Sequence, residues 1–175
     1  IAITKPDFYD GEAAFIKRLF ESGFDIVHLR KPNSDINNCR NILNELSSEE
    51  RSRIVVHDYP ELYYEFSLKG IHINKNIVKY PEGYQGFKTR SCHSLEEVML
   101  YKDDFDYVFL SPIFDSISKQ GYKSAFTQDE LRRASEEGII DEKVVALGGV
   151  TYDKISLLKD LGFGGAAMMG GAFIS

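Results

Sequence analysis

The segment from Lys143 to Thr151, KVVALGGVT, constrains the fold more than any other stretch of the chain. Its strand-favouring apolar residues lead directly into Gly148 and Gly149. A buried parallel strand has such a continuous apolar run, and glycine lets backbone N–H groups approach a phosphate. The pattern recurs at residues 165–171, GAAMMGG. Two successive strands that end in glycine predict the phosphate seat after strands seven and eight of a (β/α)8 barrel.

Six further apolar runs alternate with segments of helical spacing along the rest of the chain. The runs lie at 1–4, 25–31, 53–57, 70–74, 89–93 and 107–110. Alternation of this kind predicts an α/β fold with a parallel sheet and right-handed crossovers. An open doubly wound sheet is the alternative, but it usually has a glycine-rich turn after its first strand, and this chain has none there. We therefore favour the (β/α)8 TIM barrel.

The barrel must be a compact one, because the chain has only 175 residues and this fold typically needs about 250. Residues 75–87 contain Pro81, Gly83 and Gly86 without helical spacing, which predicts a short, irregular fourth crossover. We expect the last helix to be missing or truncated and the eighth strand to be covered by the partner in a homodimer. We expect a single domain over residues 1–175.

The charge and the cysteines exclude several classes of protein. A net charge of −6 argues against a nucleic-acid partner, which would normally face a basic surface. No apolar run approaches the ~20 residues of a membrane span. Cys39 and Cys92 lie far apart and form no CxxC pair, so we expect reduced thiols and a cytoplasmic location.

All four histidines occur in or just after predicted strands, where a barrel carries its functional residues. They are His28, His57, His72 and His93. A metal cluster is one interpretation, but we disfavour it because the chain has no H-x-H or HExxH motif. His72 lies between two isoleucines and is expected to be a core histidine. His28 and His93 are better functional candidates, because each shares its strand face with a polar neighbour, Arg30 or Ser91; a solvated strand end is the alternative.

Two basic segments could bind an anion. Arg30 and Lys31 follow an apolar strand, where a charged pair is either an anion clamp or decoration of the barrel rim. Ser116, Ser118 and Lys119 combine two hydroxyls with an ammonium, a set that suits a phosphate or diphosphate. Surface loops with serine and lysine are common, so this signal is weak alone.

Asp58 directly follows His57 at the end of the third predicted strand. Its carboxylate could hold Mg2+ beside phosphate oxygens. Equally, it could cap the helix that begins near Pro60. The local sequence does not separate the two roles.

Seven short motifs together resemble the thiamine phosphate synthase family, which has a sister branch of thiazole tautomerases. In chain order they read HLRK, HD, GIHIN, SCHSLEE, SPIFDSISK, ALGGV and GAAMMGG. The resemblance runs nearly end to end and implies a (β/α)8 barrel. It also implies a transferase of thiamine biosynthesis that couples hydroxymethylpyrimidine diphosphate to thiazole phosphate and releases diphosphate with help from Mg2+. Its partners would be small phosphorylated substrates.

The resemblance also implies roles for particular residues. Cations around the leaving diphosphate stabilise the developing charge, a role it gives to Arg30 and Lys119. It places the metal on Asp58, with His57 where the family has asparagine and His28 where it has glutamine. Lys31 stands one position before the family's lysine. The residues implied to bind phosphate or substrate include Lys31, His57, Ser91, Ser116, Ser118, Gly148, Gly149, Met169 and Gly170.

The chain also departs from the synthase pattern. Ile77 occupies the position of a second aspartate that binds Mg2+, and Lys75 brings a positive charge nearby. SCHSLEE resembles the tautomerase branch, which needs no metal, but Pro112 stands where that branch has its histidine. Two alternatives therefore remain beside the synthase. One is a tautomerase-like isomerase with His28 or His93 as acid and base; the other is an inert barrel that binds thiazole phosphate or thiamine phosphate.

Overall fold

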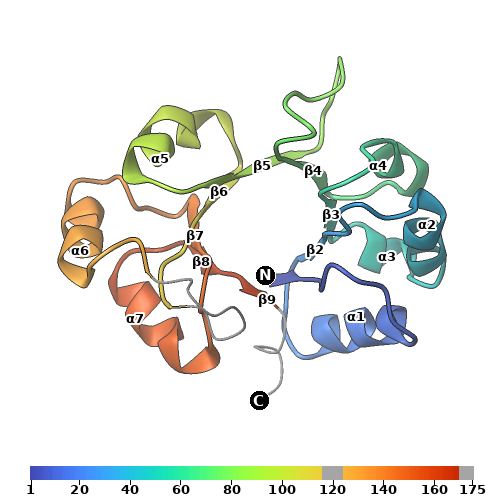
Figure 1. Ribbon diagram of the computed structural model, residues 1–175, viewed down its shortest axis with the longest axis horizontal. Coiled ribbons are helices and arrows are strands. Elements are labelled where there is room, and N and C mark those ends of the chain that lie inside the picture. Colours follow the sequence, from blue (N-terminus) through green and yellow to red (C-terminus); the bar gives the residue numbers. More distant parts are fainter. Residues whose placement is uncertain (116–123, 170–175) are drawn as a thin grey trace. The chain divides into compact units, whose positions relative to one another are not determined.

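The computed structural model describes residues 1–115 and 124–169 of the chain. By its internal contacts the chain divides into two compact units, Ile1–Phe87 and Lys88–Ser175. Both units repeat the pattern of a strand followed by a helix (Figure 1). The single domain expected from the sequence stays a prediction.

The first unit contains four strands and four helices. In chain order they are β1 (Ala2–Ile3), α1 (Glu12–Glu21), β2 (Val27–Leu29), α2 (Ile36–Asn44), α3 (Ser48–Arg51), β3 (Ile54–Val56), α4 (Glu61–Phe66) and β4 (Gly70–Ile73). Neighbouring strands pair in parallel in the order β4-β3-β2-β1, with His28 opposite Val55 and Val56 opposite Ile71. The crossovers between successive strands are helical, as the alternation predicted.

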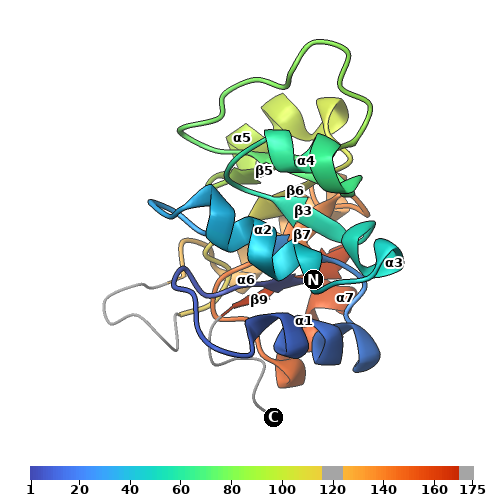
Figure 2. The ribbon, with the colours of Figure 1, turned by 90° about the vertical axis from the view of Figure 1, so that its right-hand side faces the viewer.

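Residues 74–86, which follow β4, contain no helix. They form a projecting loop, drawn in green in Figure 2. Tyr84 anchors this loop, because its hydroxyl accepts a hydrogen bond from the backbone N–H of Ile71 at 2.8 Å. The predicted short and irregular fourth crossover is therefore confirmed.

The second unit continues the same pattern. Its elements are β5 (Phe87–Cys92), α5 (Leu95–Tyr101), the 3-10 turn η1 (Lys102–Asp104), β6 (Tyr107–Leu110), α6 (Gln128–Glu136), β7 (Val144–Ala146), the 3-10 turn η2 (Tyr152–Lys154), α7 (Ile155–Asp160), β8 (Gly165–Ala166) and β9 (Met168–Met169). Strands β5 to β8 pair in parallel in sequence order. The single eighth strand predicted at 165–171 is instead two short strands that flank Ala167. The predicted loss of the last helix concerns residues outside the described part.

Local sequence signals explain where several helices begin. Ser94 caps α5 by accepting a hydrogen bond from the N–H of Glu97, and Ser47 and Thr127 form capping boxes at α3 and α6. Strands β2, β3, β4, β6 and β7 are buried along their whole length. Parallel strands covered by crossover helices have this continuous burial. Among the described residues, no helix is long and apolar enough to cross a membrane.

Candidate functional site

Polar residues follow strands β2, β3 and β4 at their carboxyl ends. The backbone N–H of Lys31, after β2, donates to Asp58 Oδ2, after β3, at 3.0 Å. The side-chain amide of Asn74, after β4, donates to the carbonyl of His57. Side-chain hydrogen bonds thus connect the carboxyl ends of β2, β3 and β4 and fix the positions of the residues that follow these strands.

Arg30 is half-buried at this edge, and its backbone is held on both sides by Thr4. The Arg30 N–H donates to Thr4 Oγ1 at 3.0 Å, and that hydroxyl donates to the Arg30 carbonyl at 3.2 Å. Within residues 1–115 and 124–169 the guanidinium itself makes no hydrogen bond or ion pair. A fixed backbone with an unpaired guanidinium suits an anion clamp.

Lys31 is placed differently from the prediction. Its side chain is 0% exposed and its ammonium forms an ion pair with Glu12 at 2.6 Å. The same ammonium donates to the carbonyls of Lys5 and Asp7 at 2.8 and 2.9 Å. Burial raises the pKa of Glu12, and the hydrogen bond and charge of Lys31 oppose that rise. The Lys31 ammonium is occupied within the fold, so the predicted anion clamp is reduced to Arg30.

Asp58 keeps a partly exposed carboxylate whose Oδ2 accepts the Lys31 N–H. It does not cap the following helix, because the N-cap of α4 is Pro60 and has no side-chain cap. Mg2+ is commonly held by one or two carboxylates together with substrate phosphates. Asp58 fits the first part of that description. The side chain of Ile77 offers no oxygen; its N–H donates to Asn74 Oδ1 at 2.9 Å, and its carbonyl accepts from the N–H of Asn74 at 3.0 Å.

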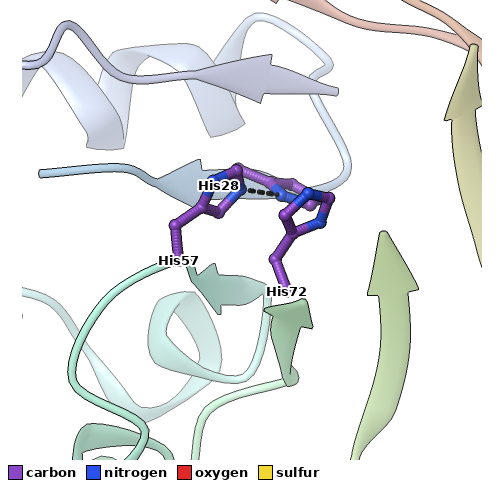
Figure 3. A group of neighbouring side chains, drawn as sticks. All are labelled: His28, His57 and His72. Atoms are coloured by element: carbon purple, nitrogen blue, oxygen red, sulfur yellow. Dashed lines mark hydrogen bonds between the residues drawn. The ribbon is translucent and has the colours of Figure 1, made fainter. Parts of the chain in front are cut away.

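His28 in β2, His57 directly after β3 and His72 in β4 form a buried cluster, the arrangement that the sequence analysis considered and disfavoured (Figure 3). His28 Nδ1 lies 2.7 Å from His57 Nε2, and the rings of His57 and His72 stack with centroids 4.1 Å apart. Their exposed fractions are 0%, 7% and 2% in chain order. The expected core burial of His72 is confirmed. His28 and His57 are also buried, so the alternative of a solvated strand end is wrong for His28; the acid–base role of His28 and the substrate contact of His57 stay predictions.

Burial of the rings, followed by electrostatic interaction with His72, lowers the pKa of both His28 and His57 well below the usual value. The signal for the cluster was present in the sequence, since the three histidines fall on successive predicted strands. What was missing was the register, which decides whether their side chains converge.

In the second unit, Ser91 lies in β5 and His93 directly follows it. Ser91 is half-buried and pairs in register with Phe109. His93 is exposed; its N–H donates to Glu97 Oε2 at 3.0 Å, and its Nδ1 lies 3.3 Å from the hydroxyl and from the carbonyl oxygen of Ser111. An exposed imidazole held at Nδ1 can exchange protons with a ligand.

The glycine pair after β7 is required by a close approach of the backbone. Gly148 and Gly149 have φ of 98° and 63°, in the left-handed region. A Cβ on Gly148 would lie 2.7 Å from Pro112 Cα, and one on Gly149 would overlap the carbonyl oxygen of Asp115. The absence of side chains at Gly148 and Gly149 therefore allows the segment from Pro112 to Asp115 to pack against the backbone of this pair.

Lys154 lies beside this pair and was missed by the sequence reading. Its ammonium donates to the Gly149 carbonyl at 3.2 Å and lies 4.3 Å from the centroid of the Phe114 ring. Met169, at the end of β9, is half-buried. The predicted residues Ser116, Ser118, Lys119 and Gly170 lie outside the described residues.

Comparison with known proteins gives a consistent result. The family model described as thiamine monophosphate synthase matches residues 1–172. The chain is 29% identical to the thiamine-phosphate synthase of Limosilactobacillus reuteri over 129 residues, which is 70% of this chain and 59% of that one. It is 23% identical to the Salinibacter ruber thiamine-phosphate synthase over 173 residues, 91% of this chain and 74% of that one. The chain thus spans less than two thirds of the first of these relatives.

Solved structures agree with the sequence relatives. The crystal structure of thiamine phosphate pyrophosphorylase from Bacteroides thetaiotaomicron matches with a TM-score of 0.88 and 42% identity, over 97% of this chain and 81% of that one. The Pyrococcus furiosus thiamine phosphate pyrophosphorylase matches with a TM-score of 0.75 and 20% identity, over 96% of this chain and 83% of that one, which supports the fold alone. The predicted TIM-barrel-type α/β fold is confirmed. This chain belongs to the thiamine monophosphate synthase family.

Proposed function

We propose that this protein is a transferase that joins hydroxymethylpyrimidine diphosphate to thiazole phosphate and releases diphosphate. The observation that carries the proposal is the pair of groups at the ends of β2 and β3. There, among the described residues, the Arg30 guanidinium has no partner, and the part-exposed Asp58 carboxylate accepts a hydrogen bond from the N–H of Lys31, the residue next to Arg30. The names of the relatives, all thiamine-phosphate synthases or pyrophosphorylases, support the same reaction.

The reaction needs positive charge around a leaving group more than it needs a base. The bond between the pyrimidine methylene carbon and the diphosphate oxygen breaks, and its electron pair leaves with the diphosphate. The thiazole nitrogen then supplies the electron pair of the new C–N bond. We assign Arg30 and Lys119 to the diphosphate, because fixed cations stabilise charge as it develops there.

Asp58 would hold Mg2+ in this proposal, and the ion when bound would neutralise diphosphate charge. With Ile77 at the other expected ligand position, substrate oxygens and water would complete the coordination. We assign Ser91, Ser116 and Ser118 to hydrogen bonds with the diphosphate oxygens.

The thiazole phosphate would bind to backbone groups after β7 and β9. We assign this seat to Gly148, Gly149, Met169 and Gly170, where backbone N–H groups can face an anion without side chains between. Lys154 adds a positive charge next to Gly149, since its ammonium donates to that carbonyl. We assign no phosphate contact to His28, His57 or Lys31, because all three side chains are buried.

The test is a two-substrate assay with and without Mg2+, with a known synthase as positive control. We expect thiamine phosphate to form and to require Mg2+. Arg30→Met should lower kcat/KM about 100-fold, equivalent to about 2.7 kcal/mol of transition-state stabilisation. Arg40→Met is the matched control and should leave kcat/KM unchanged, because Arg40 is partly exposed and paired with Glu65 on helix α4.

Other outcomes identify the alternatives. Absence of any product while the control synthase is active would reject the coupling reaction. Isomerisation of a thiazole phosphate carboxylate that survives chelation and is lost in His93→Ala would indicate the tautomerase-like enzyme. Calorimetric binding of thiamine phosphate without turnover would indicate an inert barrel.

We also propose a cytoplasmic location and a possible homodimer. The location is supported by Cys39 and Cys92, both of which are buried free thiols. Light scattering of the purified chain would measure its assembly directly.

A further inference from the structure

Three imidazoles from adjacent strands converge on one point inside the first unit (Figure 3). His28 comes from β2, His57 directly follows β3, and His72 comes from β4. One ring nitrogen from each lies within 4.8 Å of the others. Imidazole is the commonest metal ligand, so three ring nitrogens this close together could share one ion.

The spacing is close to that of a bound metal ion. Nitrogens that share a tetrahedral Zn2+ at 2.0–2.1 Å lie roughly 3.3 Å from each other. His28 Nδ1 and His57 Nε2 are 2.7 Å apart. Binding of an ion would therefore have to lengthen the distance between these two nitrogens by roughly 0.6 Å. His57 and His72 stack with an angle of only 10° between their planes. One of these two rings must rotate out of the stack for both lone pairs to point at the same ion.

Each imidazole ring offers one nitrogen lone pair to a metal ion. The backbone beneath the cluster is held in place, because Asn74 donates to the carbonyl of His57. Ligands whose backbone is already fixed lose little conformational freedom when an ion binds.

We propose that His28, His57 and His72 form a binding site for Zn2+. Imidazole ligands suit Zn2+ and its borderline neighbours Co2+ and Cu2+, whereas Mg2+ prefers oxygen ligands. The site is therefore distinct from any Mg2+ on Asp58, and it goes beyond the proposed reaction. Three imidazole ligands leave a fourth position, which water or hydroxide can occupy. A bound ion would also link β2, β3 and β4.

The first experiment is calorimetric titration of the metal-free full chain with ZnSO4 at pH 7.5. We expect one Zn2+ per chain with a dissociation constant of about 1 μM or lower. The single variants His28→Gln, His57→Gln and His72→Gln should each weaken binding at least about 100-fold. His93→Gln is the matched control, because His93 is exposed and belongs to the second unit, and it should bind Zn2+ as the unchanged chain does.

Two measurements on the unchanged chain guard against variants that fail to fold. Zn2+ should raise Tm and Mg2+ should not, because a ligand that binds only the folded state stabilises it. Electron paramagnetic resonance of the Cu2+-loaded chain should show hyperfine coupling to several nitrogens. The proposal would be overturned if the chain failed to bind one equivalent of Zn2+, or if the variants of His28, His57 and His72 bound Zn2+ as tightly as the unchanged chain. A Cu2+ spectrum with oxygen ligands alone would also overturn it. None of these readouts uses enzyme activity, so they stand apart from the proposed reaction.

Discussion

The two units of this chain bury very different side chains on a similar arrangement of strands and helices. Among the described residues, six buried polar or charged residues lie in the first unit and two in the second. Those of the first are Thr4, Glu12, His28, Lys31, His57 and His72, and those of the second are Thr89 and Ser111. The interior of β6 and β7 is apolar throughout.

This difference indicates that the two units solve different packing problems. Buried ionic and imidazole groups cost free energy unless they are paired, so the first unit must hold its side chains in fixed hydrogen-bonded positions. The second unit presents backbone at Gly148 and Gly149, where side chains are excluded by close approach. Buried polar side chains are thus concentrated in the first unit, and the close approach of the backbone at the glycine pair belongs to the second. Four predictions test this contrast.

The largest effect is expected from Lys31→Met, which leaves the Glu12 carboxylate buried without its partner. The free energy of unfolding should fall by about 3–5 kcal/mol, because removing one member of a buried ion pair strands the other charge. The comparison in the second unit is Asp141→Asn, which breaks the more exposed pair with Lys102 and should cost about 1 kcal/mol or less. Urea denaturation followed by circular dichroism measures both.

The contrast would be lost if the two variants were equally destabilised. The double variant Glu12→Leu with Lys31→Met provides a further control. It removes both charges, so it should recover much of the stability lost by Lys31→Met alone.

A smaller effect is expected from Gly149→Ala in the second unit. The new Cβ overlaps the Asp115 carbonyl and the backbone has a positive φ, so we expect a loss of about 2 kcal/mol in unfolding free energy and weaker phosphate binding. Gly23→Ala in the first unit is the control: its φ is 107° but nothing lies within 4 Å of the added atom. It should cost about 1 kcal/mol. If the Gly149 variant were as stable as the Gly23 variant, the close approach of residue 149 to the Asp115 carbonyl would be contradicted.

The helix caps should respond alike in the two units. Ser47 in the first unit and Thr127 in the second each form a capping box with a glutamate three residues later. Replacement of either by alanine should lower the unfolding free energy by about 1 kcal/mol, because an N-terminal N–H group loses its acceptor. Thermal melts of both variants check this. A large difference would show that the contrast between the units extends to their helix ends.

The smallest difference between the units is expected in the reaction rates of their two thiols, Cys39 in the first unit and Cys92 in the second. Burial raises the pKa of Cys39 and of Cys92 to about 11. Because the thiolate is the reactive form, both should react with iodoacetamide at pH 8 at least about 100-fold more slowly than free cysteine. Reaction in denaturant gives the reference rate. Fast labelling of one thiol in the folded chain would show that its unit opens more readily than the other.

Much of the fold followed from local patterns. The parallel strands and the irregular segment after β4 each depend on near neighbours in sequence, and both are confirmed. The eighth strand was less predictable, since its glycine-rich sequence gave no sign of the break at Ala167. Strand propensity is weak in such short stretches because pairing and burial decide it.

The sequence by itself determined that the chain is a parallel α/β protein with glycines at its late strand ends, because apolar periodicity and glycine placement act over a few residues. Only the tertiary structure decided which polar residues meet. In the folded chain, Lys31 is buried and paired with Glu12, and Asp58 does not cap the following helix. Three histidines from β2, the end of β3 and β4 lie together. The physical reason is register: a shift of one residue sends every side chain of a strand to its other face, and no local pattern fixes that choice.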